Sequence, residues 1–173
     1  MPLYYLDTSA LLKRYKTEKG TEVIDELFSS RKLDEVFVTS HFTSIEIESV
    51  AARALKGNAL NKEACGVLIR LYAEDIEEQI IVLPVSTALL SQAAEAARRN
   101  ALRAGDAVHL ASALRVREPS HPSDLVFVTS DRELLQAAER EGFTALDPEN
   151  VDATPSLRAV RETAKEPSPH EDQ

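Results

Sequence analysis

The sequence predicts a three-layer α/β/α fold, in which a central parallel sheet of four to five strands lies between two layers of helices. Short apolar runs recur along the chain, and they alternate with longer segments that have the apolar spacing of helices. This alternation is typical of parallel sheets that are covered on both faces. The chain has 173 residues, of which 43% are hydrophobic and 28% charged, as expected for one globular domain.

The predicted strands are short and apolar because a parallel strand buried on both faces needs no polar side. The first strand is followed at once by Asp7-Thr8-Ser9, which are residue types that begin helices. Pro84 closes the third strand. In chain order, the predicted strands cover residues 3–6, 36–39, 80–83, 125–128 and 143–146.

Helices are predicted between these strands from apolar periodicity and from residues that begin or end helices. Residues 21–29 place their apolar side chains on one face, and Gly57-Asn58 stops a helix that begins at Ser40. The predicted helices cover residues 10–15, 21–29, 40–56, 61–74, 86–100, 105–117 and 131–141, with a loop over 119–123.

Two parts of the chain differ in composition. Residues 1–150 are predicted to form the folded domain, and residues 151–173 a polar C-terminal tail. Prolines and polar residues become frequent near Asp152, which is typical of segments that bury little apolar surface. A short helix is expected within the tail, around residues 157–164, and no chemistry is assigned to it.

The overall charge argues against broad adhesion to nucleic acids or anionic membranes, because the formal net charge is -9. It does not exclude a nucleic acid as substrate, since a local basic patch or a bound cation reverses the field at one site. The single cysteine, Cys65, rules out an internal disulfide and suits the cytoplasm, where we expect the protein to act. No signal peptide is expected at the start of the chain, and no apolar stretch approaches the roughly 20 residues that span a bilayer.

Four acidic residues fall where predicted strands end or where the next helices begin. Asp7 directly follows the first strand, and Asp131 follows the fourth. Glu46 lies in the first turns of the helix after the second strand, and Asp106 lies at the start of another helix. In open parallel sheets, ligands bind outside the carboxyl ends of the strands, so we expect these acids to meet at one edge.

Several carboxylates at one edge favour a divalent cation, because like charges raise one another's pKa unless a cation lies among them. Hard oxygen donors select Mg²⁺ or Mn²⁺. Such a cation suits phosphodiester hydrolysis, since it activates water and stabilises charge on the leaving oxygen. The four histidines have no spacing that is typical of zinc sites.

Each of these acids also has a purely structural interpretation. Asp7 could simply cap the first helix, and Asp106 could complement the dipole of its own helix. Residues 43–46 have the form of a capping box that ends in Glu46. Glu48 points about 200° away from Glu46 on a helix, so only one of the two can face the edge.

The fourth acid and His109 are open to the same question. Ser130 and Glu133 have the form of a capping box, with Asp131 in the first turn. His109 comes three residues after Asp106, so it is either a ligand or, more commonly, a packed or hydrogen-bonded histidine. Cys65 is expected to be a small buried side chain rather than a nucleophile.

Basic residues flank two of the acids. They would either contact phosphate groups or line solvated helix faces. These residues are Lys13, Arg14 and Lys16 after Asp7, and Arg98, Arg99 and Arg103 before Asp106.

Four stretches around these acids resemble the motifs of PIN-domain ribonucleases, in the expected order. The third is the most specific, and the four together are far more specific than any one alone. They are residues 5–12 (YLDTSALL), 45–53 (IEIESVAAR), 104–114 (AGDAVHLASAL) and 126–134 (VFVTSDREL), and the resemblance spans residues 3–147.

The resemblance implies a PIN fold and metal-dependent cleavage of RNA, with Asp7, Glu46, Asp106 and Asp131 as catalytic and metal-binding residues for Mg²⁺ or Mn²⁺. It aligns Glu46, rather than Glu48, with the second acid of the family. The size and layout resemble VapC toxins of type II toxin–antitoxin systems, which implies an RNA substrate, a small antitoxin partner and a homodimer. The segment after Asp152 is a departure, because minimal toxins of this kind often lack it.

Other classes of function are less consistent with the residues. A phosphatase of the haloacid-dehalogenase type would need an acid two residues after Asp7, where Ser9 stands. A phosphoryl-accepting receiver domain would need a lysine after a late strand, and residues 129–131 offer none. A housekeeping RNA-processing nuclease and a non-catalytic PIN-fold protein-binding module remain the alternatives within the resemblance.

Overall fold

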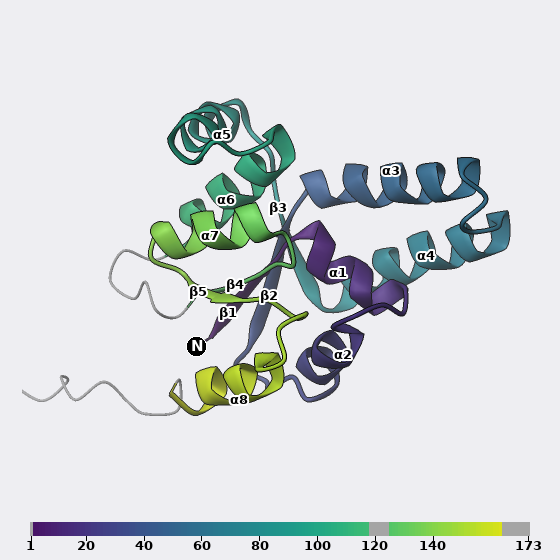
Figure 1. The fold of residues 1–173 in the computed structure, drawn as a ribbon, viewed down its shortest axis with the longest axis horizontal. Helices are drawn as coiled ribbons and strands as arrows, with labels where there is room; N and C mark the ends of the chain where they lie inside the picture. Colours follow the sequence, from purple (N-terminus) through teal and green to yellow (C-terminus); the bar gives the residue numbers. More distant parts are fainter. Residues whose placement is uncertain (1, 118–124, 164–173) are drawn as a thin grey trace, which may run out of the picture.

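The computed structural model describes residues 2–117 and 125–163 of the protein (Figure 1). The loop predicted over residues 119–123 lies outside the described residues. The strands are β1 (Leu3–Leu6), β2 (Val36–Ser40), β3 (Ile80–Leu83), β4 (Leu125–Val128) and β5 (Thr144–Leu146). The helices are α1 (Thr8–Tyr15), α2 (Thr21–Ser29), α3 (Phe42–Lys56), α4 (Lys62–Glu78), α5 (Thr87–Asn100), α6 (Ala104–Val116), α7 (Arg132–Arg140) and α8 (Ala153–Thr163).

The five strands form one parallel sheet with the order β3-β2-β1-β4-β5. The central strand β1 pairs with β2 on one side and with β4 on the other, so Leu3 lies opposite both Val36 and Leu125. The chain thus builds outward from β1 through β2 and β3, and later returns to add β4 and β5 on the opposite side. The carboxyl ends of β1 and β4 therefore mark a topological switch point, which is where open α/β sheets bind their ligands.

Helices cover both faces of the sheet, which confirms the predicted three layers (Figure 1). Successive strand side chains point to opposite faces. Tyr4 and Leu6 pack against α1, α2, α4 and α8, whereas Tyr5 packs against α5, α6 and α7. Helices α3 and α4 run side by side away from the sheet (Figure 1). No helix in the described part of the chain is long and apolar enough to cross a membrane.

Helix α8 packs against the core through an apolar stripe. The helix expected around residues 157–164 begins earlier, at Ala153. Ala153 and Leu157 are 1% and 0% exposed, and both belong to the core cluster on the α1 face of the sheet. Arg161, on the same helix, forms an ion pair with Glu35, which precedes β2. The polar composition of this segment hid the stripe, because few of its residues are apolar.

Two helix boundaries differ from the prediction for identifiable reasons. Ser40 ends β2 instead of beginning α3, although its hydroxyl still accepts a hydrogen bond from the backbone N–H of Phe42 at 3.2 Å. Helix α4 continues to Glu78, beyond the predicted end at residue 74. Its last turns are held by Asp75, whose buried carboxylate binds Arg14 of α1.

Candidate active site

Asp7 lies at the carboxyl end of β1, where it is 4% exposed. Its Oδ1 accepts a hydrogen bond from the backbone N–H of Ala10 at 2.9 Å, so Asp7 caps α1. Ser9 Oγ donates to the same carboxylate at 2.9 Å, and Thr129 Oγ1 donates to Oδ2 at 2.9 Å. Burial still raises the pKa of Asp7, although the charge of His109 and these hydrogen bonds act in the opposite direction. The structural and the functional interpretations of Asp7 are therefore compatible.

Asp131 begins α7 directly beyond β4. Its Oδ1 accepts from the backbone N–H groups of Glu133 and Leu134 at 2.9 and 3.0 Å, so Asp131 itself is the N-cap. The predicted capping box with Ser130 as the cap is therefore wrong, because Ser130 Oγ is buried without a hydrogen-bond partner. The Thr129 hydroxyl donates to Asp7 and accepts from the Asp131 N–H at 3.0 Å, and it thereby joins the ends of β1 and β4.

Asp106 lies in the first turn of α6, and its side chain is 19% exposed. Its Oδ2 is buried and has no hydrogen-bond partner. The pKa of Asp106 is raised to about 6 by burial and by the negative charges of Asp131 and Asp7, against the opposing charges of Arg103 and His109. The Arg103 guanidinium lies 3.8 Å from Asp106 Oδ2 and 3.8 Å from Asp131 Oδ2. Three predicted site acids are thus close enough to influence one another.

Glu46 lies within α3 and is held by side chains from two other helices. His109 Nε2 lies 2.8 Å from Glu46 Oε2, and the Thr8 hydroxyl donates to the same oxygen. Burial raises the pKa of Glu46. The hydrogen bonds from His109 and Thr8, together with the charge of His109, lower it by more, so the pKa of Glu46 is lowered overall. The alternative in which Glu46 only closes a capping box over residues 43–46 is excluded, because α3 begins at Phe42 and Glu46 bonds to side chains of α1 and α6. Glu48 is exposed, as expected for the acid on the opposite side of the helix.

The residues at this edge offer oxygen donors that can be compared with the needs of a divalent cation. Within residues 2–117 and 125–163, no group of three or more His, Cys, Asp or Glu side chains is arranged so that it could hold a metal ion. The donor chemistry nevertheless fits one, because Asp106 has a buried oxygen without a partner and a pKa raised by neighbouring carboxylates. A divalent cation would relieve both conditions.

Most of the basic residues near the acids have other partners. Lys13 is 2% exposed and forms ion pairs with Glu18 and Glu149 at 3.1 and 2.6 Å. Arg14 pairs with Asp75 at 2.5 Å and stacks over the ring of Phe28. For these two residues, both the phosphate-contact and the solvated-face interpretations are wrong, because internal carboxylates bind them.

The other predicted phosphate contacts remain at the surface. Arg99 pairs with Glu141 at 2.7 Å, and Lys16 lies 3.4 Å from Glu18. Arg98 is exposed. Arg103, whose side chain is 75% exposed, is the one that lies beside the site acids.

Sequence reasoning missed the hydroxyl groups that organise this edge. Thr8 and Ser9 were expected only as helix-capping types, yet their side chains bind Glu46 and Asp7. Ser9 Oγ also accepts from the backbone N–H of Ser130 at 2.8 Å. A signal was present, because hydroxyl residues adjoin an acid at the end of β1 (Asp7-Thr8-Ser9) and again, in mirror order, at the end of β4 (Thr129-Ser130-Asp131).

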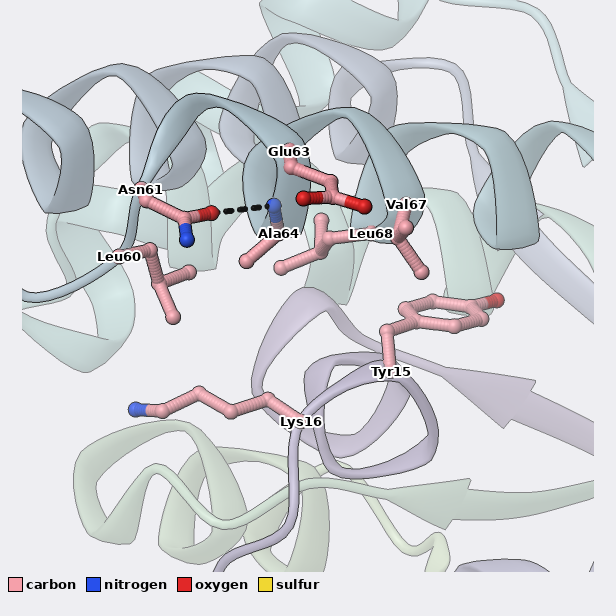
Figure 2. Close-up of a pocket in the computed structure, with 8 residues that line it drawn as sticks. All are labelled: Tyr15, Lys16, Leu60, Asn61, Glu63, Ala64, Val67 and Leu68. Atoms are coloured by element: carbon pink, nitrogen blue, oxygen red, sulfur yellow. Dashed lines mark hydrogen bonds between the residues drawn. The ribbon is translucent and has the colours of Figure 1, made fainter.

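A surface cavity of about 390 Å³ lies away from the acids, between the end of α1 and the start of α4 (Figure 2). Figure 2 shows Tyr15 and Lys16 on one side of it and residues of α4 on the other. Asn61 caps α4 through a 2.8 Å hydrogen bond from the Ala64 N–H. None of the four site acids lines this cavity, so the chemistry is assigned to the edge of the sheet. The lining residues are Tyr15, Lys16, Leu60, Asn61, Glu63, Ala64, Val67 and Leu68.

Comparison with known proteins defines the class. The sequence model of the PIN domain matches residues 4–140, so the chain belongs to the PIN-domain family. Ribonuclease VapC45 and Ribonuclease VapC49, from two strains of Mycobacterium tuberculosis, are each 31% identical to it over 142 residues, which cover 82% of this chain and 93% of the relative.

Solved structures show the same fold. The crystal structure of PAE2754 from Pyrobaculum aerophilum is 22% identical, with a TM-score of 0.60 over 92% of this chain and 98% of that one. The structure of VapBC-1 from nontypeable Haemophilus influenzae is 18% identical, with a TM-score of 0.57 over 86% and 99% of the two chains. The PIN fold expected from the sequence is confirmed.

Proposed function

We propose that the protein is a ribonuclease that hydrolyses RNA phosphodiester bonds and serves as the toxin of a type II toxin–antitoxin system. The observation that supports the proposal is a group of acids near the switch point of the sheet. The Arg103 guanidinium lies 3.8 Å from both Asp106 and Asp131, and the charges of Asp131 and Asp7 help burial to raise the pKa of Asp106 to about 6. The similarity to ribonucleases of the VapC group, which extends over 93% of their length, supports the same activity.

PIN-domain ribonucleases generally depend on divalent metal ions, and we propose Mg²⁺ or Mn²⁺ for this chain. Asp7, Asp106 and Asp131 would hold the ion, with Glu46 as the fourth acid. When bound, the ion would supply a Lewis acid that activates water and stabilises charge on the leaving oxygen.

The chain's own residues prepare this chemistry. Ser9 and Thr129 hold the Asp7 carboxylate, and the cap of α7 holds that of Asp131. Asp106 Oδ2, which is buried and without a hydrogen-bond partner, is available to bind a cation or accept a proton. Arg103 lies at the exposed rim beside Asp106 and Asp131, where it would contact a phosphate of the RNA.

We further propose a small antitoxin as partner, a homodimer as the functional assembly, and the cytoplasm as the place of action. The similarity to VapBC-1, a toxin–antitoxin complex, supports the antitoxin. A small antitoxin-like reading frame beside the gene would distinguish a toxin from a housekeeping RNA-processing nuclease.

The direct test is cleavage of a mixed RNA pool with Mn²⁺ or with a chelator. We expect the unmodified protein to cleave only with Mn²⁺ and Asp7→Asn to be inactive under both conditions. Glu48→Gln, an exposed change on the same helix as Glu46, is the matched control and should cleave normally. Metal-dependent cleavage that persists in Asp7→Asn would contradict the assigned role.

One observation favours a second candidate, a non-catalytic PIN-fold module that binds proteins. Within the described ranges, the acids are not gathered into a formed metal site. Titration calorimetry separates the two functions, because a protein-binding module would bind no Mn²⁺ at millimolar concentration.

A further inference from the structure

His109 connects three elements at the candidate site. It lies on α6 three residues after Asp106 and is 2% exposed. Its Nδ1 lies 2.9 Å from the hydroxyl of Tyr5 on β1, and its Nε2 lies 2.8 Å from the carboxylate of Glu46 on α3. Both ring nitrogens therefore have partners, which fixes the plane of the imidazole.

The partners also define the direction of each hydrogen bond. A carboxylate is an acceptor only, so His109 Nε2 carries the proton that Glu46 accepts. In the neutral ring Nδ1 can then only accept. Burial raises the pKa of Tyr5 well above its usual value, so the Tyr5 phenol keeps its proton and donates it to Nδ1. The hydrogen bonds from Tyr5 to His109 and from His109 to Glu46 therefore run in one direction.

Glu46 also contacts the sequence neighbours of two other site acids. The Thr8 hydroxyl, next to Asp7, donates to the same Glu46 oxygen that His109 binds. The other oxygen, Oε1, lies against Gly105, next to Asp106, only 2.8 Å from where a Cβ would stand. Any side chain at Gly105 would push the carboxylate away, so the glycine leaves room for Glu46.

We propose that His109 is a positioning residue of the nuclease site, which holds the Glu46 carboxylate between Asp7 and Asp106 so that Glu46 can serve as an oxygen donor to the cation. The inference rests on the proposed function, because it assumes that the acids bind a cation. In metal sites, a side chain that hydrogen-bonds to a ligand commonly fixes the orientation of that ligand in this way.

Two substitutions separate this role from simple packing. In His109→Gln, the amide nitrogen can take the place of Nε2 and still donate to Glu46. In His109→Asn, the shorter side chain matches only Nδ1, which faces Tyr5, and the hydrogen bond to Glu46 is lost. If His109 served only in packing, the Gln variant would have no reason to bind a cation more tightly than the Asn variant.

The measurement is the Kd of the intact protein for Mn²⁺ by titration calorimetry, with the unfolding temperature recorded without metal. We expect His109→Asn to weaken Mn²⁺ binding by about 10- to 100-fold and His109→Gln to stay within about threefold of the unmodified protein. Half-maximal RNA cleavage by His109→Asn should require correspondingly more Mn²⁺.

Tyr5→Phe removes only the hydroxyl that orients the imidazole, and it serves if His109→Asn does not fold. We expect it to weaken Mn²⁺ binding in the same direction. Unchanged Mn²⁺ affinity in His109→Asn or, if that variant is unfolded, in Tyr5→Phe would overturn the positioning role, as would equal losses in the Asn and Gln variants. In those cases the nuclease proposal would stand, because the unmodified protein would still bind Mn²⁺ and cleave RNA. An unmodified protein that neither binds Mn²⁺ nor cleaves RNA would overturn both proposals.

Discussion

Glu35 and Asp106 are both acids withdrawn from water, and their surroundings differ in almost every respect. Glu35 is 1% exposed and precedes β2 at the amino edge of the sheet. Arg161 donates to both of its oxygens at 2.7 and 2.8 Å, and the Lys32 N–H donates at 3.0 Å. Asp106, at the carboxyl edge, has a buried oxygen without a hydrogen-bond partner and two acids among its electrostatic neighbours.

The difference separates a carboxylate whose partners hold the fold together from one whose partners are incomplete, as we expect of a residue that binds a cation. A buried charge is tolerated when its partner is close and its hydrogen bonds are complete, as at Glu35. At Asp106 the nearest cation, that of Arg103, is 3.8 Å away and largely exposed, and Oδ2 has no hydrogen bond, so such a group lowers the stability of the free protein. Unsatisfied acids that persist at a switch point are typical of functional sites.

The largest expected effect is the loss of RNA cleavage when Asp106 is replaced. Asp106→Asn keeps the size of the side chain but removes its charge, so RNA cleavage with Mn²⁺ should fall by about a thousandfold or more. A quantitative gel assay of initial rates measures the loss. Less than a tenfold loss would mean that Asp106 is not at the reacting centre.

Removing the partner of Glu35 should affect stability instead. Arg161→Ala leaves a buried carboxylate without its cation, so the free energy of unfolding should fall by about 3–5 kcal/mol. Urea denaturation measures the change. Cleavage by the fraction that is still folded should be normal, and a specific loss of cleavage would contradict the division between the two regions.

Mn²⁺ should stabilise the protein only through the acids at the carboxyl edge of the sheet. At 100 times its Kd, Mn²⁺ should raise the free energy of unfolding of the unmodified protein by about 2.7 kcal/mol. Asp106→Asn should show little of this gain, whereas Arg161→Ala should show all of it. Differential scanning fluorimetry against Mn²⁺ concentration compares the three proteins.

The smallest effect is a gain in stability without metal. The pKa of Asp106 rises from 3.8 to about 6 on folding, so the native state binds the proton more tightly, and the protein loses stability as the pH rises from about 4 to about 6. Asp106→Asn avoids this penalty, so it should be more stable than the unmodified protein at pH 7, by at most the roughly 3 kcal/mol that this shift in pKa represents. The advantage should vanish below pH 4, and an advantage that is independent of pH would contradict the electrostatic cause.

Much of the fold could be predicted because its signals are local. Buried parallel strands such as Leu125–Val128 are continuous apolar runs, and Asp7 and Asn61 cap helices where the sequence placed the helix starts. Helix α8 was harder to delimit, because its buried stripe rests on few side chains, among them Ala153 and Leu157. Its packing depends on a sheet face that no local pattern describes.

The candidate site was predictable only in part, because its contacts also depend on packing between distant segments. Its four acids could be placed at one edge from strand order and family motifs, and their roles stay predictions. The contact between His109 and Glu46 joins residues 63 apart in sequence, and that between Arg14 and Asp75 joins residues 61 apart. Pairs of this kind follow from how helices pack, so no spacing rule could find them.

The strand order has a consequence for the timing of assembly during translation. Asp7 is made early, but its partner Thr129 follows 122 residues later, because β4 fills the place beside β1 only after β2 and β3 are in the chain. The carboxylates therefore cannot come together until most of the polypeptide has left the ribosome exit tunnel. A nascent chain that lacks β4 therefore cannot assemble the acidic edge of the sheet.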